Sequence, residues 1–446
     1  MRMQLSDALS VGGVIESRVS AAIRHVDYFD LHGDASDRNS GVMFFPTRSD
    51  GADGWYPQTF NRSVMLSKLV AARPDWIFVL EKGSLEHFRP RNFVVVQSIT
   101  DYLLSLSKHS RLRANPAIFA ITGSVGKSTL VRMISGALTR SSSCDTIRAR
   151  RVTPLIVFDH LLNGLGPKSR NLVVETGLYE RDHVRELVAI LNPTHGVLLN
   201  AYEMHTGRPG LANIADVVAA KSYVISGSQR SIANRVLEGT LGALGRPATK
   251  WFEVIDTGSG AATIEDLSIN TLRVRSGNGQ HYRIDRYLRT GVFLEQVLAL
   301  ICCIEERQIE GRVAEKLIND VIQDPSVYSF RKLMRGSQTL LVDTHASYRG
   351  YFQAMSATSY SKAALIIASL NFVEEDPAQN ISAIVRCFSR FDAVVIANDL
   401  RKYFKHSPSS ARMSQRRGIL DSVESCDTVI VHDPAGSLDL ETSYNK

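Results

Sequence analysis

The chain has 446 residues, of which 44% are hydrophobic and 22% are charged. This length suggests roughly three domains of ordinary size, and the composition is that of a soluble globular protein with several hydrophobic cores. The net charge of +7 attracts anions such as nucleotides, but the basic clusters lack interleaved aromatic residues, so we do not expect nucleic-acid binding.

Neither a membrane anchor nor a disulfide framework is expected. No apolar stretch approaches the ~20 residues that cross a bilayer, and the first residues lack the apolar run of a secretion signal. The five cysteines are scattered without a Cys-x-x-Cys pair, and Cys302 and Cys303 are adjacent. This pattern favours reduced, buried thiols. We therefore expect a cytoplasmic protein with no membrane partner.

The first part of the chain, residues 1–113, is expected to form a mixed α/β domain. It ends in the polar run from Ser107 to Pro116, which we interpret as a linker. In residues 114–325, short apolar runs alternate with segments of helical spacing, as in a parallel sheet covered by helices. The expected strands are Ile118–Ile121, Leu172–Val174 and Val197–Leu199, and the expected helices are Val184–Leu191 and Ile214–Tyr223.

The pattern restarts near residue 325, so residues 326–446 are expected to form a separate Rossmann-like domain. The fold class is therefore α/β, with three domains and a central parallel sheet that carries a phosphate loop. The strands expected in the last domain are Thr339–Val342, Leu365–Ala368, Ala393–Ala397 and Thr428–Val431.

The most informative segment is Thr122-Gly-Ser-Val-Gly126-Lys127-Ser128, between an apolar strand and a segment with helical spacing. Strand, glycine loop and helix start together form a phosphate site, because the backbone N–H groups and the helix dipole face the anion. A standard P-loop needs a glycine where this chain has Ile121, so the spacing speaks against an ordinary kinase or GTPase.

Further polar residues follow the next two strands. Glu175 follows the strand near residue 173, where the carboxyl edge of a parallel sheet binds ligands. The next strand ends at Asn200, and the loop after it carries His205. Lys221 ends an Ala- and Val-rich helix. Taken singly, each of these residues is more often a surface residue than a site residue, and only their combination favours a site.

In this order and spacing, the chain resembles the Mur ligase superfamily. The family has a Thr-Gly-x-x-Gly-Lys-[Ser/Thr] loop, then a strand-end Glu, an Asn-x₄-His loop and a Lys after an Ala-rich helix. The branch that adds D-alanyl-D-alanine is the most similar, because Asp37–Pro46 with Asp53-Gly54 resembles its N-terminal pattern. Leu340–Tyr348, preceded by Phe330-Arg331, resembles its C-terminal pattern, so the resemblance covers nearly the whole chain.

The resemblance implies an ATP- and Mg²⁺-dependent ligase that joins a small-molecule carboxylate to an amine through an acyl phosphate. It implies catalytic roles for Lys127, His205 and Lys221, the last by carbamylation in many family members. It implies Mg²⁺ ligation by Ser128, Glu175 and His205, with Thr129 as the alternative hydroxyl. The residues implied to bind the nucleotide are Thr122, Gly123, Ser124, Gly126, Lys127, Ser128, Thr129, Arg331 and Asp343.

Several family positions differ in this chain. The family's Gly-x-His-x-x-x-Asn segment near the adenine falls at Thr290–Gln296, where both the His and the Asn are missing, and the end of the Leu340–Tyr348 motif also departs. The residues that would bind the ATP phosphates are kept, whereas those that would contact the adenine and the amine have changed. We therefore favour a ligase of a specialised biosynthetic pathway. The alternatives are the cell-wall ligase itself and a nucleotide-binding protein without catalysis.

Overall fold

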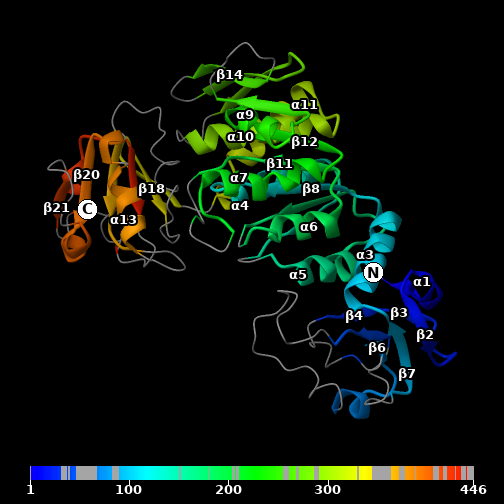
Figure 1. The fold of residues 1–446 in the computed structure, drawn as a ribbon. Helices are drawn as coiled ribbons and strands as arrows, with labels where there is room; N and C mark the ends of the chain where they lie inside the picture. The colour runs from blue at the N-terminus through cyan, green and yellow to red at the C-terminus, as the bar shows by residue number, and fades with distance from the viewer. Residues whose placement is uncertain are drawn as a thin grey trace. The chain divides into compact units, whose positions relative to one another are not determined.

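The structure is a computed structural model of the whole chain (Figure 1). The residues that it describes are 2–31, 38, 41–46, 68–82, 90–149, 152–178, 180–202, 206, 210–254, 261–267, 271–285, 291–328, 331–343, 363–370, 377–386, 388–404, 411–414, 419–426, 428–432 and 438.

The chain divides into two compact units. Unit 1 contains Met1–Ile118, Ser142–Leu172 and Glu186–Asn192, and unit 2 contains Phe119–Ser141, Val173–Arg185 and Pro193–Lys446.

Unit 1 contains a five-stranded sheet whose buried strands are β6 (Ile77–Glu81) and β7 (Asn92–Val96). The strand order is β2-β7-β6-β5-β4, with β2 (Val14–Arg18), β5 (Val42–Phe44) and β4 (Tyr28–Asp30). Helix α3 (Ile99–Ala114) follows β7, and Ser98 caps it by accepting from Asp101 N. The prediction of a linker from Ser107 onward was wrong, because buried Ser107 and Ser110 lie on the packed face of this helix.

The second sheet has nine strands in the order β16-β15-β14-β13-β12-β11-β8-β10-β9, and most of its strands belong to unit 2, whereas β9 falls within the residues of unit 1. Strands β8, β11, β12 and β13 run parallel to one another, so their carboxyl ends meet at one edge. The predicted strands and helices of this region are confirmed, with bounds shifted by a few residues. The strands are β8 (Ala117–Thr122), β9 (Cys144–Ile147), β10 (Asn171–Glu175), β11 (His195–Leu198), β12 (Arg230–Asn234), β13 (Lys250–Glu253), β14 (Ala262–Leu267), β15 (Thr271–Arg275) and β16 (His281–Asp285).

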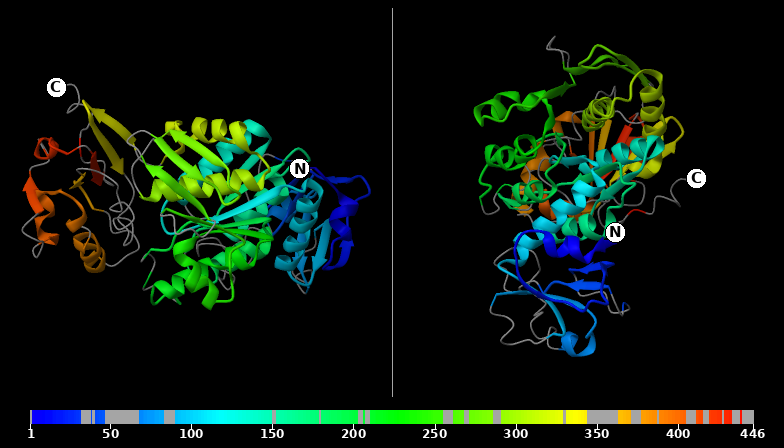
Figure 2. Two further views of the ribbon diagram at one scale, coloured as in Figure 1. Left: turned by 90° about the horizontal axis from the view of Figure 1, so that it is seen from above. Right: turned by 90° about the vertical axis from the view of Figure 1, so that its right-hand side faces the viewer.

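Helices cover both faces of this sheet (Figure 2). Helices α4 (Lys127–Ser141), α10 (Gly291–Glu306) and α11 (Gly311–Ile322) pack together on one face. The other face carries the helices that follow β11 and β12. These are α7 (Ile214–Lys221), α8 (Tyr223–Ser226) and α9 (Glu238–Ala243).

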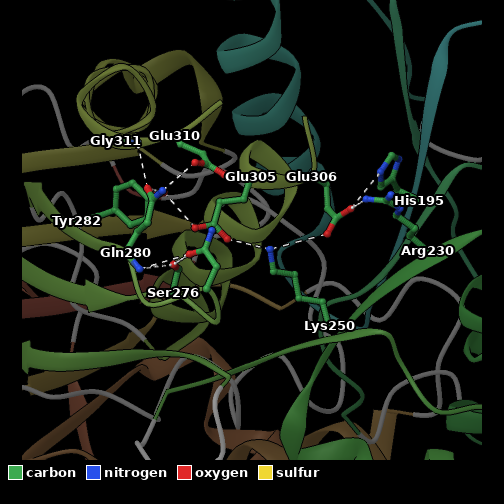
Figure 3. Close-up of polar contacts among 11 residues, drawn as sticks. His195, Arg230, Lys250, Ser276, Gln280, Tyr282, Glu305, Glu306, Glu310 and Gly311 are labelled. Atoms are coloured by element: carbon green, nitrogen blue, oxygen red, sulfur yellow. Dashed lines mark hydrogen bonds and ion pairs between the residues drawn. The ribbon is translucent and has the colours of Figure 1, made fainter. Parts of the chain in front are cut away.

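The amino ends of the parallel strands carry a network of charged side chains (Figure 3). Lys250 Nζ lies 2.8 Å from Glu305 Oε2 and 3.8 Å from Glu306 Oε1, at the end of α10. Arg230 and His195 also approach Glu306, at 2.8 and 3.7 Å. The hydrogen bond from His195 lowers the pKa of Glu306, burial raises it, and the hydrogen bond from Arg230 lowers it further. The net pKa of Glu306 is about 2. Glu306 therefore contributes stability above the ordinary pKa of 4.5, and this contribution is lost as the pH falls toward 2.

The C-terminal part of unit 2 contains a six-stranded sheet in the order β17-β18-β22-β19-β20-β21. Strands β18, β22, β19, β20 and β21 are parallel, as a Rossmann-like arrangement requires, and the four strands predicted there are confirmed. The strands are β17 (Arg331–Arg335), β18 (Gln338–Asp343), β19 (Ala363–Ile367), β20 (Ala393–Ala397), β21 (Ala411–Ser414) and β22 (Thr428–His432).

The cysteines behave as reduced thiols in the part of the chain that the structure describes. Cys302, Cys303 and Cys426 are free and buried, and Cys144 is free and partly exposed. Burial raises the pKa of Cys302 to about 12, so this thiol stays protonated and unreactive at neutral pH. Cys387 lies outside the described residues.

Gly196 of β11 passes very close to α8, and we predict that Gly196→Ala is strongly destabilising. A Cβ there would lie 2.0 Å from the backbone oxygen of Val224, which no side-chain rotation relieves. We expect the free energy of unfolding, measured by urea denaturation, to fall by about 3 kcal/mol. Gly239→Ala in α9 is the control, because nothing lies within 4 Å of the added Cβ. It should raise stability by about 0.5 kcal/mol, and equal effects of the two variants would refute the argument.

Candidate functional site

The phosphate loop connects β8, whose six residues are all buried, to the N-terminus of α4. Gly126 has φ +85, and a Cβ there would lie 2.5 Å from Gln296 Nε2 and 2.9 Å from Val292 Cγ1. Only glycine fits, for both conformation and space. Because the first N–H groups of α4 have no partner within the helix, this end of the 15-residue helix presents donors and a partial positive charge.

Asn200, just after β11, holds the loop from the side. Its Oδ1 accepts from the backbone N–H groups of Ser124 and Val125 at 2.9 and 3.0 Å. Its Nδ2 donates to the carbonyl oxygen of Val125 at 3.0 Å and to Glu295 Oε2 at 2.8 Å. From α10, Gln296 Nε2 donates to the carbonyl oxygen of Gly126 at 2.9 Å. The loop conformation is therefore fixed by side chains from two other segments.

The structure brings Ser128 and Glu175 together, as the sequence predicts. Ser128, in the first turn of α4, donates its hydroxyl to Glu175 Oε2 at 2.8 Å, and both side chains are half-buried. A hydroxyl and a carboxylate oxygen are the donors that Mg²⁺ prefers, so this pair fits a magnesium ion. Thr129, the alternative hydroxyl, is buried at 5% exposure and is the weaker candidate.

Two lysines lie against the loop. Lys127 donates to the backbone oxygen of Ser124 at 3.3 Å. Burial lowers the pKa of Lys127, and the charge of Glu175 opposes this effect. Lys221 is completely buried and donates to the backbone oxygen of Gly123 at 2.8 Å. Burial and then the charge of Lys127 hold the pKa of Lys221 well below its ordinary value.

The remaining predicted site residues are placed by their secondary structure or lie outside the described residues. Thr122 is fully buried at the end of β8. Arg331 begins β17 and Asp343 ends β18 of the six-stranded sheet. His205, which the resemblance implies as a magnesium ligand, lies outside the described residues.

Sequence reasoning missed Glu295 and Gln296. They lie in the segment Thr290–Gln296, where the family's His and Asn are missing. Gln296 nevertheless donates to the phosphate loop at Gly126, and Glu295 accepts from Asn200, which holds that loop. The signal was present in the sequence. A Glu-Gln pair inside the apolar run Val292-Phe-Leu-Glu-Gln-Val-Leu-Ala-Leu300 must find partners if the helix is buried.

No family model matches the chain, and no curated protein matches its sequence. Solved structures match it over nearly its whole length. A crystal structure of MurF from Acinetobacter baumannii superposes with a TM-score of 0.73 at 12% identity, covering 99% of this chain and 98% of that chain. MurF ligase from Thermotoga maritima in complex with ADP gives 0.67 at 14% identity, covering 93% and 96%.

This chain has the Mur ligase fold. The same fold extends to a pseudomurein peptide ligase type C from Methanothermus fervidus, with a TM-score of 0.59 at 13% identity, covering 88% of this chain and 92% of that chain. The prediction of an α/β Mur ligase architecture is thereby confirmed at the level of the fold. In the part of the chain that the structure describes, no helix is both long and apolar enough to span a membrane.

Proposed function

We propose that the chain is an ATP-dependent ligase that joins a carboxylate to an amine. The observation that carries this proposal is the contact between Ser128 and Glu175 beside a glycine-rich phosphate loop. The pair supports the proposal because hydroxyl and carboxylate oxygens are ligands that Mg²⁺ prefers, and such an ion would neutralise a triphosphate bound at the loop. The ADP complex of the Thermotoga maritima MurF, which shares this fold, supports a nucleotide as the ligand.

In the proposed reaction, a carboxylate oxygen of the substrate attacks the γ-phosphorus of ATP, and ADP leaves. The nitrogen of the amine then attacks the acyl carbon, loses a proton and expels phosphate, so that an amide remains. Phosphoryl transfer depends chiefly on positioning and on neutralising charge. Gly123 and Gly126 let the backbone approach the phosphates, and the Lys127 ammonium offsets their negative charge.

Magnesium, when bound, would neutralise the charge on the phosphate oxygens. Ser128 and Glu175 would hold one ion, and His205 is proposed as a ligand of a second. Lys221 is proposed to be carbamylated, and its lowered pKa supports this because carbamylation requires a neutral amine. Arg331 and Asp343 are proposed to contact the nucleotide.

The domain division at residues 1–113, 114–325 and 326–446 stays a proposal. It is supported by the sheets, since the five-, nine- and six-stranded sheets each fall within one of these ranges.

A specialised biosynthetic pathway is the setting that we propose. The changed residues at Thr290–Gln296 and in the C-terminal motif support it, because an unchanged substrate pair would favour unchanged contacts. The runner-up is a cell-wall ligase that adds D-alanyl-D-alanine, which the whole-length similarity to MurF favours.

The test is the release of phosphate from ATP in the presence of Mg²⁺ and a pool of carboxylates and amines. Release that depends on the amine, together with a new mass equal to acid plus amine minus water, supports the ligase. ATP binding without turnover on any combination would instead indicate a nucleotide-binding protein without catalysis.

We predict that Ser128→Ala and Glu175→Gln each lower the affinity of the site for Mg²⁺. Each variant removes one proposed oxygen ligand, so the Mg²⁺ concentration for half-maximal ADP binding should rise at least about tenfold. Ser135→Ala is the control, because this hydroxyl on the same helix donates to the helix backbone, at Arg132 O. Unchanged Mg²⁺ dependence in both site variants would remove the metal assignment.

A further inference from the structure

Glu295 is a buried carboxylate next to the phosphate loop that the proposed reaction does not use. The residue is 8% exposed and lies in the second turn of α10. Its Oε2 accepts from Asn200 Nδ2 at 2.8 Å. Its Oε1 accepts from Asn234 Nδ2 at 3.0 Å and from the Tyr202 hydroxyl at 3.2 Å. The carboxylate thereby joins residues at the carboxyl ends of β11 and β12.

These contacts favour the charged form of Glu295, because the amides of Asn200 and Asn234 and the hydroxyl of Tyr202 all donate to it. Asn234 must present its amide nitrogen, since its Oδ1 accepts from Val236 N at 3.2 Å. Burial raises the pKa of Glu295 to about 7, although the hydrogen bonds from Asn200, Tyr202 and Asn234 lower it. A neutral residue would cost less in a purely structural role, so the retained carboxylate points to a task that a neutral side chain performs less well.

That task lies in the orientation of Asn200. Its Oδ1 must face the N–H groups of Ser124 and Val125, and its Nδ2 must face Val125 O. A flipped amide would set oxygen against the carbonyl of Val125 and nitrogen against two N–H groups. It would also set oxygen against the Glu295 carboxylate at 2.8 Å, so Glu295 adds strongly to the penalty for flipping.

The orientation of Asn200 in turn determines which loop amides face a ligand. Because Asn200 engages the N–H groups of Ser124 and Val125, those donors point to the protein. The donors left for an anion are those at the start of α4, beside Lys127. Gln296, the neighbour of Glu295, holds Gly126 at the other end of the loop.

We propose that Glu295 is a positioning residue: it fixes the amide of Asn200 so that the loop keeps its phosphate-binding conformation before the nucleotide arrives. This inference rests on the proposed function for its ligand, and on the hydrogen-bond geometry for its mechanism. It assigns a role to the segment in which the family's adenine-side residues are missing.

The first test is a charge exchange between the two partners, read as the dissociation constant for ADP with Mg²⁺ by calorimetry on the full chain. Asn200→Asp sets one carboxylate against another and should weaken ADP binding roughly a hundredfold. Adding Glu295→Gln restores a donor opposite Asp, so the double variant should regain at least about tenfold. Double-variant binding as weak as that of Asn200→Asp alone would overturn the proposal.

The matched control is Glu305→Ala, which removes another buried carboxylate of α10, one that contacts Lys250 at the amino end of β13 (Figure 3). It should lower the thermal unfolding midpoint and leave ADP affinity unchanged. If Glu305→Ala and Glu295→Ala weaken ADP binding equally, the effect of Glu295 is general destabilisation, and the positioning role is wrong.

The second test does not depend on nucleotide binding, so it separates this inference from the proposed function. Hydrogen exchange of a peptide covering residues 119–130 is followed by mass spectrometry without ligand. In Glu295→Ala, the amides of Ser124 and Val125 should exchange about tenfold faster than in the wild type. Unchanged exchange would overturn the proposal even if ADP binds. If Glu295→Ala exchanges faster and the wild-type chain does not bind ADP, the positioning mechanism is supported and the proposed function is refuted. If Asn200→Asp fails to fold, the exchange rates of Glu295→Ala decide whether Glu295 positions the loop.

Discussion

Replacing Lys127 with Met is expected to reduce ATP-dependent turnover by a factor on the order of 10³. The ammonium is the one full positive charge that the loop itself supplies to the phosphates, and charge neutralisation dominates phosphoryl transfer. Methionine keeps the length and the apolar stem of the side chain but carries no charge. The measurement is the rate of phosphate release from ATP with the acid and amine that the wild type accepts.

The same substitution should leave the fold intact. Burial lowers the pKa of Lys127, which means that the native state disfavours the charge. The thermal midpoint of Lys127→Met should therefore equal or exceed that of the wild type. Lys316→Met, on the exposed face of α11, is the control and should change neither quantity. Turnover that persists in Lys127→Met would show that the phosphate site has been assigned to the wrong segment.

Replacing Lys250 with Met is expected to produce a large loss of stability. Lys250 is the cation that lies 2.8 Å from Glu305, whose side chain is only 2% exposed. Without it, Glu305 keeps the Tyr282 hydroxyl, at 3.0 Å, but loses its counter-charge. Removing one partner of a buried ion pair costs about 3–5 kcal/mol. We expect about 3 kcal/mol in urea unfolding, because the Lys250 side chain is itself 20% exposed.

Two further variants distinguish this mechanism from a loss of packing. Lys250→Met combined with Glu305→Gln removes the unpaired charge, so it should recover much of the lost stability. Arg230→Met breaks the ion pair with Glu306 at the exposed end of the network, where solvent screens the charge, and should have a much smaller effect. A double variant no more stable than Lys250→Met would show that the charge is not the cause.

The pH dependence of Lys250 has a definite sign. Burial lowers its pKa, but the hydrogen bond and charge of Glu305, with the charge of Glu306, help to raise it, and the net shift is upward from 10.5. The contribution of this lysine to stability is therefore complete below pH 10.5 and is lost as the pH rises through the higher pKa of the folded state. Neutral pH is the correct condition for the unfolding comparison.

The sequence by itself determined the elements that depend on local pattern. The apolar run before Thr122, the glycine at position 126 and the helical spacing after Lys127 specify strand, loop and helix start. Spacing also placed Glu175 at the end of a buried strand. Parallel strands present their carboxyl ends at one edge of a sheet. The sequence alone therefore predicted that Glu175 lies close to Ser128.

Only the tertiary structure decided which polar side chains hold the loop. Glu295 lies 95 residues from Asn200, and Gln296 lies 170 residues from Gly126. Sequence spacing carries no information on such pairs, because the crossing of α10 over the sheet sets them. The same holds for Lys221, which is 98 residues from Gly123 and fully buried against it. Buried polar groups need hydrogen-bond partners. A sequence shows which polar residues lie in apolar segments, but it does not identify the residues that pair with them.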